Sequence, residues 1–576
     1  MRFETNPNKI EVPFLRRGAK GRVMVGWCSF SHALNLISHI SKMLTLLIFI
    51  PILFAFIILV LPSGMRASFK YITLLATLVQ LCICVWLYLN FKTGAGFSGI
   101  DHESQFQFVQ KIPWINLNLG TLGTMQADYF VGIDGISIGL LVMTSLVMVI
   151  AALSSWEIKS NLKGFFALFL LLDMALMGVF CSLDFFLFYI FYELMLLPLY
   201  FLIGMWGGTR REYAAIKFFL YTLFGSVFML LVMIGLYLSV KDPATGNHTF
   251  NMIQMMNPAN YTPGSVFSVL SHQTIFGFPA RTVGFVVLFI AFAIKVPVVP
   301  LHTWLPDAHV EAPTPVSIIL AGILLKIGGY GIIRICLGIF PEVASSGAWW
   351  LGLLGIISIL YGAFNALAQK DFKRIIAYSS VSQMGFVLLG IASQTAEGIS
   401  GAVMQMVSHG FLATMLFFLV GVVYNRVHNR EIYNFRGLGS LMPKYTVFIM
   451  IAFFASLGLP GFSAFIAEAF SLAGAFKSSS VNGLLPQWMA VCGAIGILFS
   501  ACYFLWTLQR MFFGSLSLKG GDIWKTALTD LNTREIIALV PLALVVLVIG
   551  IMPSLVFGKI NDSVLELVSF TKNIIH

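Results

Sequence analysis

The sequence predicts an all-α polytopic membrane protein, and two observations support this fold class. Hydrophobic residues make up 58% of the 576 residues and charged residues only 10%, with a mean hydropathy of +0.90. Apolar runs of about 20 residues, the length that crosses a bilayer as a helix, recur along nearly the whole chain. This composition excludes a soluble globular protein.

The charge and cysteine patterns exclude further classes. The formal net charge is +11, but the basic residues lie in short loops between apolar runs, where they act as orientation signals, so we expect no nucleic-acid partner. The seven cysteines are scattered and form no CxxC pair, and no glycine-rich phosphate loop is present. We therefore expect no metal and no redox or nucleotide cofactor on this chain.

Residues 1–42 form a basic, only patchily apolar extension. One interpretation is a disordered or surface-lying segment. The alternative is that Met43 is the true start and the preceding residues are not native. We treat 43–576 as one transmembrane domain.

The apolar runs predict about 14 transmembrane helices. Two long loops, 92–132 and 241–281, interrupt them and carry the residues of turns and short strands. The predicted spans are 43–61, 70–91, 133–153, 163–182, 184–206, 214–240, 282–304, 316–339, 347–369, 372–395, 398–424, 443–472, 487–513 and 536–557.

Loop charge predicts the orientation of these spans. The loops that follow odd-numbered spans hold about three times as many Lys and Arg residues as the others, and such loops face the cytoplasm. Both termini are then extracytoplasmic. We expect the inner membrane of a bacterial cell as the location, with the lipid bilayer as the surrounding medium.

An inverted repeat is also expected. Spans 4–8 (about 163–339) and spans 9–13 (about 347–513) each contain one interrupted helix as the fourth member. The interruptions are the prolines that follow Lys295 in span 7 and the Gly458–Gly461 segment in span 12. Units with an odd number of spans lie in opposite orientations, as in transporters that bind their substrate at broken helices.

Two lysines lie at membrane depth. At ~1.5 Å per residue, Lys295 is about 20 Å into span 7 and Lys326 about 15 Å into span 8. A charge near the middle of a core roughly 30 Å thick costs at least ~2.5–3.5 kcal/mol. Pro297 and Pro300 add broken backbone, which is stable only where protein or water covers it. These costs indicate a functional site.

Glu193 lies about 14 Å into span 5 at the helix rise and is the natural partner of Lys295. An isolated carboxylate at that depth would stay neutral, whereas a lysine neighbour would keep both groups charged. One interpretation is a static ion pair that joins two helices. The other is a pair whose making and breaking controls the proton affinity of the lysine.

Three further polar groups extend the row. Lys326 has no evident partner and is too far from either interface to snorkel well. His409 is suited to relay protons, although a lone histidine is as often a packed core residue. Glu468 follows the second interruption. Hydroxyl and amide groups expected to order water between Lys326 and His409 belong to Ser379, Ser380, Ser382 and Gln383.

Other polar residues are less informative. Lys217 either snorkels or approaches Glu193, and Asp184 is expected to cap the helix that follows it. Asp173 lies in mid-span without a partner. His302 and His309 flank a proline-rich turn and are weak candidates for metal binding.

Four segments resemble the antiporter-like subunits of respiratory NADH:quinone oxidoreductase (complex I). They are KVPVVPLHTWLPDAHVEAPTPVSIILAGILLKIGGYG at 295–331, FYELMLLPLYFLIGMWG at 191–207, DFKRIIAYSSVSQMGFVLLG at 371–390 and SLGLPGFSAFIAEAF at 456–470. The resemblance extends from about Met43 to the C-terminal region. Glu468 favours the branch of the family with a glutamate in the second broken helix, where the related L and N subunits and the multisubunit sodium/proton antiporters usually carry lysine.

The resemblance implies a proton-translocating subunit that couples electron transfer to transport. It implies that Glu193 and Lys295 are the coupling pair, Lys326 the central proton site, His409 a relay and Glu468 the terminal site. Flavin, iron–sulfur clusters and quinone would lie on partner subunits, and L- and N-type subunits would be neighbours. One departure is Gln383, where the family usually has a histidine, because an amide cannot carry a proton.

Two alternatives stay open. One is a subunit of a multisubunit sodium/proton antiporter, which a sodium requirement would favour. The other is a structural scaffold in which the buried charges only hold helices together.

Overall fold

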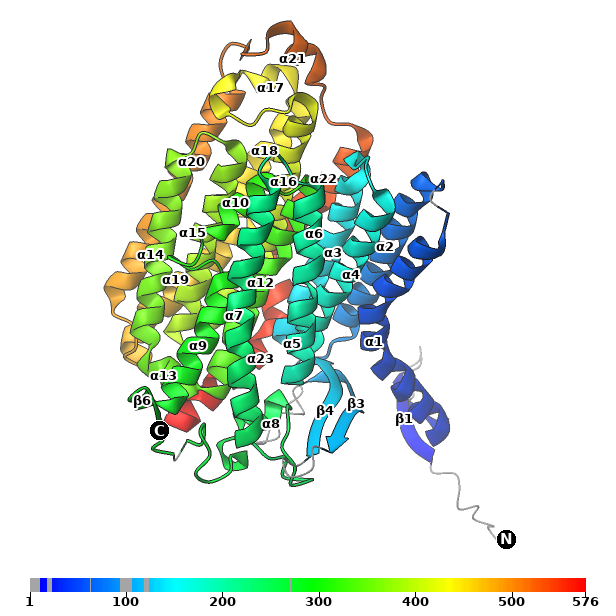
Figure 1. Ribbon diagram of the computed structural model, residues 1–576, viewed down its shortest axis with the longest axis vertical. Helices are drawn as coiled ribbons and strands as arrows, with labels where there is room; N and C mark the ends of the chain where they lie inside the picture. Colours follow the sequence, from blue (N-terminus) through cyan, green and yellow to red (C-terminus); the bar gives the residue numbers. More distant parts are fainter. Residues whose placement is uncertain are drawn as a thin grey trace.

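The computed structural model describes residues 11–17, 23–62, 64–93, 106–118, 124–269 and 271–575. In these ranges the chain forms an elongated bundle whose helices run mainly along its long axis (Figure 1). Twelve of the described helices are long and apolar enough to cross a membrane. The chain is a multi-pass membrane protein. The expected total of 14 spans stays a prediction, since the helices at the two remaining positions are interrupted.

The first half of the bundle contains seven long or paired helices. Pro198 has no N–H for the carbonyl of Leu194, and the helix is interrupted at Met195, beside Glu193. The helices are α1 (Phe30–Val60), α2 (Arg66–Asn90), α3 (Gly135–Ser154), α4 (Leu162–Cys181), α5 (Phe185–Leu194), α6 (Leu196–Trp206) and α7 (Arg211–Ser239).

The second half contains further interrupted helices and the most buried ones. Its helices are α9 (Ala280–Lys295), α10 (Trp304–Glu311), α11 (Thr314–Ile319), α12 (Leu325–Gly331), α13 (Pro341–Ser346), α14 (Ala348–Ala368), α15 (Phe372–Ser393), α16 (Ala396–Val427), α18 (Pro443–Ser456), α19 (Ser463–Val481), α20 (Gln487–Phe512), α22 (Thr533–Ile551) and α23 (Ser554–Ile575). Further short helices are α8 (Met252–Met256), α17 (Leu438–Leu441) and α21 (Gly521–Ala527).

Burial divides the helices into an inner and an outer set. Every residue in the apolar window of 314–337 and in that of α16 is buried, and 94% of the residues in that of α15. In α1, α2, α7 and α20 fewer than half of the residues are buried. Because the inner helices carry Lys326, Gln383 and His409, these polar side chains face protein and not lipid.

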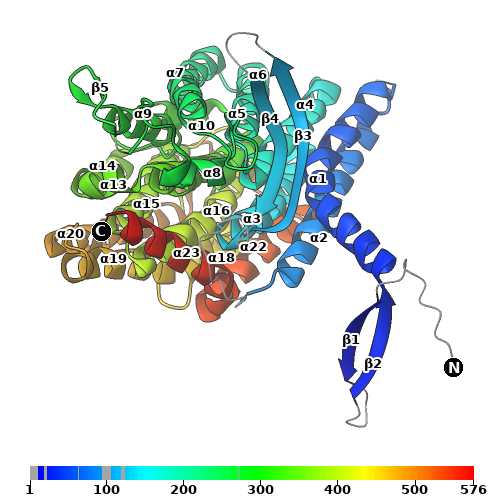
Figure 2. The same ribbon diagram turned by 90° about the horizontal axis from the view of Figure 1, so that it is seen from below.

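The described strands pair antiparallel in two-stranded sheets. The hairpin β3 (Gln107–Asn118) and β4 (Thr124–Ile133) lies across one end of the bundle, with Ile112 opposite Tyr129 (Figure 2). It lies in the loop where the sequence predicts short strands, although 94–105 and 119–123 lie outside the described residues. The other pairs are β5 (Thr274–Ile275) with β6 (Phe278–Pro279), and β7 (Phe435–Arg436) with β8 (Ser517–Leu518).

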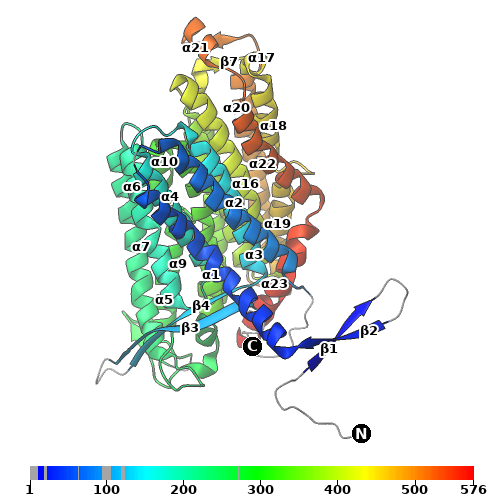
Figure 3. The same ribbon diagram turned by 90° about the vertical axis from the view of Figure 1, so that its right-hand side faces the viewer.

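The basic extension also contains regular structure. β1 (Glu11–Arg17) and β2 (Val23–Ser29) pair and project from the bundle, and α1 begins directly after them (Figure 3). Residues 1–10 and 18–22 lie outside the described residues. The interpretation of 1–42 as a disordered or non-native segment stays a prediction for those residues.

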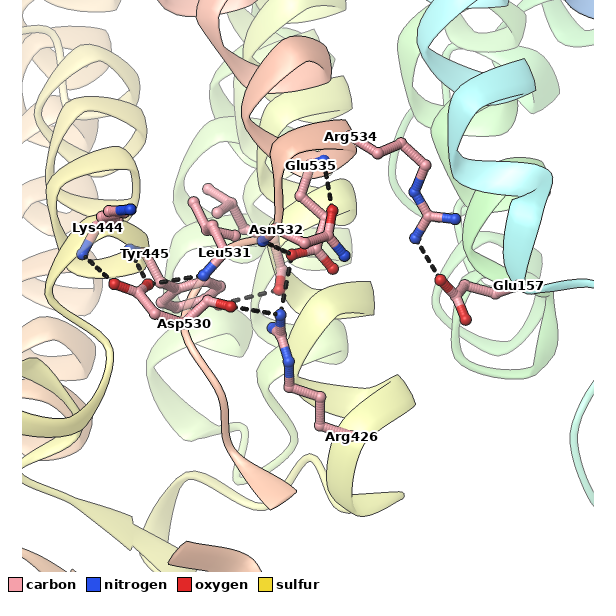
Figure 4. Close-up of polar contacts among 10 residues, drawn as sticks. Glu157, Arg426, Lys444, Tyr445, Asp530, Leu531, Asn532, Arg534 and Glu535 are labelled. Atoms are coloured by element: carbon pink, nitrogen blue, oxygen red, sulfur yellow. Dashed lines mark hydrogen bonds and ion pairs between the residues drawn. The ribbon is translucent and has the colours of Figure 1, made fainter. Parts of the chain in front are cut away.

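A polar cluster fixes the start of α22 and of α18 (Figure 4). The carboxylate of Asp530 accepts hydrogen bonds from the backbone N–H groups of Lys444 and Tyr445, at 2.9 and 3.0 Å. These are first-turn donors of α18, whose own N-cap residue Met442 makes no side-chain cap. Nearby, Asn532 caps α22 and Glu535 accepts from Arg426 at 2.9 Å. The loop before α22 therefore positions the first half of the second interrupted helix.

Candidate functional site

The site is centred on Lys326, which lies between two π-helical turns at Leu320–Leu324 and Ile332–Leu337. Such turns break the regular i to i−4 pairing, and they are frequent at functional sites. The Nζ atom of Lys326 donates to the carbonyl of Ala321 at 2.5 Å. The sequence predicts an uninterrupted span here, so the π-helical turns are a feature that it did not indicate.

His409 of α16 is the second partner of Lys326. The distance from Lys326 Nζ to His409 Nδ1 is 2.8 Å, and both side chains are buried. The sequence predicts water between these two residues. The structure corrects this prediction, because the lysine and the histidine are in direct contact.

Of the four groups expected between Lys326 and His409, only Ser380 contacts the histidine, and it does so on the far side. Its Oγ lies 3.1 Å from His409 Nε2. Ser379 and Ser382 instead donate to the backbone carbonyls of Ile376 and Ile359. The row thus runs from Lys326 through His409 to Ser380.

Two amides follow Ser380 in the direction of Glu468. Gln405 Nε2 donates to Gln383 Oε1, and Gln383 Nε2 donates to the Ser456 carbonyl at 3.2 Å. The side chains of Ser379, Ser380, Gln383, Gln405, His409 and Ser456 line a small cavity. Gln405 Oε1 and Ser456 Oγ have no hydrogen-bond partner among the described residues. Buried polar groups of this kind are ordinarily satisfied by water.

Glu468 of α19 is buried, and neither of its carboxylate oxygens has a partner among the described residues. It faces the interruption between α18 and α19. Gly458 in that interruption has φ +79°, and a Cβ atom there would lie 2.5 Å from Glu468 Oε2. Glycine is required at this position both for the backbone conformation and for the close approach of the carboxylate.

Lys295 ends α9, at the first interruption. Its Nζ lies 3.2 Å from Met195 Sδ and 3.3 Å from the ring centroid of Tyr192. Glu193 lies near the end of α5, two residues before Met195, and one of its buried oxygens has no partner among the described residues. Its carboxylate forms no ion pair with Lys295, whose Nζ is held by Met195 and Tyr192 instead. In this conformation α5 and α9 are therefore not joined by a salt bridge between Glu193 and Lys295.

The interrupted helix packs directly on the helix of Lys326. A Cβ atom on Gly328 would lie 2.7 Å from the carbonyl oxygen of Phe292, so only glycine permits this approach of α9 to α12. Lys295 and Lys326 therefore lie on two helices whose backbones are in direct contact.

A cavity of about 820 Å³ opens at the α10–α11 connection. Glu311 in its wall accepts from the backbone N–H of Arg210 at 2.9 Å, and Lys373 donates to the Ala312 carbonyl at 2.6 Å. The cavity is lined with basic residues that the sequence places in cytoplasmic loops.

His309 lies between this cavity and Lys326. It is fully buried and stacks on Phe417 with ring centroids 4.4 Å apart, and it lies within electrostatic range of both Lys373 and Lys326. Neither ring nitrogen has a partner among the described residues. The sequence indicated a histidine here but not its position, since that depends on how α10 turns back into the bundle.

Of the remaining candidates, Lys217 and Asp184 have structural partners and Asp173 has none among the described residues. Lys217 forms an ion pair with Asp307 at 2.7 Å, which corrects the alternative that it approaches Glu193. Asp184 caps α5 by accepting from Leu187 N–H at 3.0 Å, as predicted, and burial raises the pKa of Asp184 to about 7. Asp173 is fully buried beside Gln80 with neither carboxylate oxygen bonded among the described residues. No three His, Cys, Asp or Glu side chains in the described part of the chain gather as metal ligands, His302 and His309 included.

Comparison with known proteins gives one family. The family model described as "NADH:quinone oxidoreductase/Mrp antiporter, TM" matches residues 182–498. NADH-quinone oxidoreductase subunit M of Rhodobacter capsulatus is 37% identical over 535 residues, which are 92% of this chain and 96% of the relative. NADH-ubiquinone oxidoreductase chain 4 of Chondrus crispus is 35% identical, over 90% of this chain and 97% of the relative.

Solved structures give the same fold. Respiratory complex I from Thermus thermophilus with bound NADH contains a chain that matches with a TM-score of 0.75 and 27% identity, over 92% of this chain and 99% of that one. A chain of the Mrp complex from Dietzia sp. DQ12-45-1b matches with a TM-score of 0.73 and 20% identity, over 93% and 99%. At that identity the second match shows the fold alone.

Proposed function

We propose, from the premise that this chain belongs to the family of membrane subunits found in NADH:quinone oxidoreductase and the Mrp antiporters, that it is the M-type subunit (chain 4) of an NADH:quinone oxidoreductase and carries protons across the membrane. The observation that supports this most strongly is the direct contact of Lys326 with His409 inside the bundle. Two bases at 2.8 Å can share a proton but cannot both hold one without strong repulsion. The pair is thus suited to pass a proton onward.

The route that we propose starts at the large cavity at the α10–α11 connection. A proton passes from the region of Glu311 and Lys373 to His309 and then to Lys326. From Lys326 it moves to His409, across the amide-lined cavity, and to Glu468. Glu468 is the exit because its unpaired carboxylate lies at the second interruption.

Coupling to electron transfer would act through Glu193 and Lys295. In this conformation the ammonium group of Lys295 is held by Met195 and the Tyr192 ring. A Glu193 carboxylate close to Lys295 would neutralise that ammonium group and raise the proton affinity of Lys326, and its withdrawal would leave the charge of Lys295 to repel a proton on Lys326. The making and breaking of this contact changes the field at the central proton site.

Redox chemistry belongs to other subunits in this proposal. Flavin, iron–sulfur clusters and quinone would be carried there, and L- and N-type subunits would flank this chain in the inner membrane, with both termini extracytoplasmic. Glu468 in place of lysine supports the M-type assignment over a sodium/proton antiporter subunit.

Replacing Lys326 by alanine in the assembled complex tests the function. Assembly and NADH oxidation with a reduced number of protons pumped per electron are expected. Normal pumping by the assembled variant would exclude the mechanism. Loss of assembly would favour the scaffold, and a sodium requirement would favour the antiporter.

A further inference from the structure

An apolar groove of about 480 Å³ lies away from the polar row, between α2, α3, α16, α22 and α23. In Figure 3, α2 and α22 are both on the near side of the bundle and α23 lies below them. The floor and walls include Val142 and Leu146 of α3, Phe411 of α16, and Leu544 and Val548 of α22. Because Leu544 and Val548 are 55% and 42% exposed, the groove opens toward the lipid side of the bundle.

Two glycines of α3 shape this groove. Gly135 is in backbone contact with α23, since a Cβ atom there would lie 2.0 Å from the carbonyl oxygen of Lys559. One turn further on, Gly139 leaves the floor open, with only Val407 near the position of its missing side chain. From Gly135 to Leu146 the groove follows α3 for about 16 Å, which is roughly half of the hydrocarbon core. Its length therefore corresponds to one leaflet.

A single cation closes one end of the groove. Lys559 of α23 lines it, and its Nζ donates to the Phe91 carbonyl at 2.6 Å and lies 5.3 Å from the Tyr88 ring centroid. An ammonium group has three donors, and this carbonyl takes one of them. Lys559 thus lies at the end of an apolar groove, at the level where the amphipathic helix α23 crosses the bundle. This placement is complementary to the phosphate group of a lipid whose acyl chain lies in the groove.

We propose that this groove binds one anionic phospholipid, with an acyl chain along α3 and α22 and the phosphate at Lys559. The cation favours a phospholipid over an isoprenoid quinone, whose head group carries no charge. The proposal rests on the groove and on Lys559, and it is independent of the proton route.

Photolabelling of the assembled complex in liposomes tests it. The probe is phosphatidylglycerol with a diazirine in one acyl chain, and labelled peptides are identified by mass spectrometry. We expect labelling of the α3 and α22 segments that line the groove. Labelling is expressed relative to α7, whose residues such as Leu231 are exposed on the outside of the bundle.

Three variants separate specific binding from bulk contact. Lys559→Gln is expected to reduce the relative groove labelling by about fivefold, because the attraction between one surface lysine and an anionic lipid changes the binding constant by about that factor. Val548→Trp fills the exposed side of the groove and is expected to abolish labelling with Lys559 intact. Lys241→Gln removes an exposed lysine from a loop at the same end of the bundle and is expected to change nothing.

Three results would overturn the proposal. Unchanged labelling in Lys559→Gln would identify bulk lipid in the groove. Stronger labelling of the same segments by a diazirine-bearing isoprenoid quinone would identify a quinone site. Labelling of α7 without any labelling of the groove would show that a protein neighbour covers it.

Discussion

Replacement of His409 by glutamine separates proton carriage from helix packing. The two ring nitrogens of His409 contact Lys326 and Ser380, at 2.8 and 3.1 Å. A glutamine amide can still accept a hydrogen bond from Lys326, but it cannot take up a proton. We therefore expect the variant to assemble and to oxidise NADH. The number of protons pumped per electron should fall by the fraction that normally passes through this chain.

The structural cost follows from the contacts of Lys326. In His409→Ala the buried ammonium keeps only the Ala321 carbonyl, and a lost hydrogen bond to a charged group is worth about 1.5–3 kcal/mol. In His409→Gln most of this contact is retained, so the loss should stay below about 1 kcal/mol. The alanine variant is thus expected to lose thermal stability, whereas the glutamine variant should not.

Proteoliposomes with a pH-sensitive dye give the assay. Proton uptake is divided by the NADH oxidised under the same conditions, and the thermal stability of each complex is measured in parallel. Thr507→Ala is the matched control, because that buried hydroxyl donates to the Tyr503 carbonyl of its own helix and does not line the small cavity beside His409. A His409→Gln complex with the wild-type ratio of protons to electrons would refute the relay, and a wild-type ratio in all variants would leave only a packing role.

Three further results are expected. Gln383→His places a titratable group beside the His409 cavity and should retain or raise the proton-to-electron ratio; loss of pumping would show that the amide orders water there. Asp530→Ala removes the carboxylate that caps α18 and should cost about 1–2 kcal/mol of stability, whereas an unchanged melting temperature would mean that the start of α18 needs no cap. Because burial raises the pKa of Asp184 from 3.8 to about 7, the folded chain binds more protons than the unfolded chain in that range, so stability should fall as pH rises through it. Asp184→Asn keeps the cap, and its melting temperature should show a smaller fall between pH 5 and pH 8; an identical fall would remove Asp184 as the cause.

The fold was largely predictable because the bilayer imposes its own length and polarity. A helix of about 20 apolar residues satisfies its backbone internally in lipid, so each span is encoded locally. The interruptions after Lys295 and at Gly458 follow from proline and glycine in the same local way. Irregularities that no proline marks were not visible, and the two π-helical turns around Lys326 are the clearest case.

The candidate residues were visible for a related reason, whereas their contacts were not. A charged or titratable side chain such as Lys326 or Glu468 stands out in an apolar run whatever it touches. That Lys326 contacts His409, 83 residues away, depends on how α12 packs against α16. The same holds for Lys295, which a sequence argument pairs with Glu193 but which lies against Met195 and Tyr192.

By itself the sequence determined that this chain crosses a membrane many times and that acids and bases are buried at its interruptions, because both facts follow from residue type along one helix. Only the tertiary structure decided which of those groups meet, since a hydrogen bond between helices depends on distances of a few ångströms that helix packing sets. It also decided that Lys559, one lysine among many in the sequence, lies at the end of an apolar groove, because Gly135 allows α23 to cross α3 at that point.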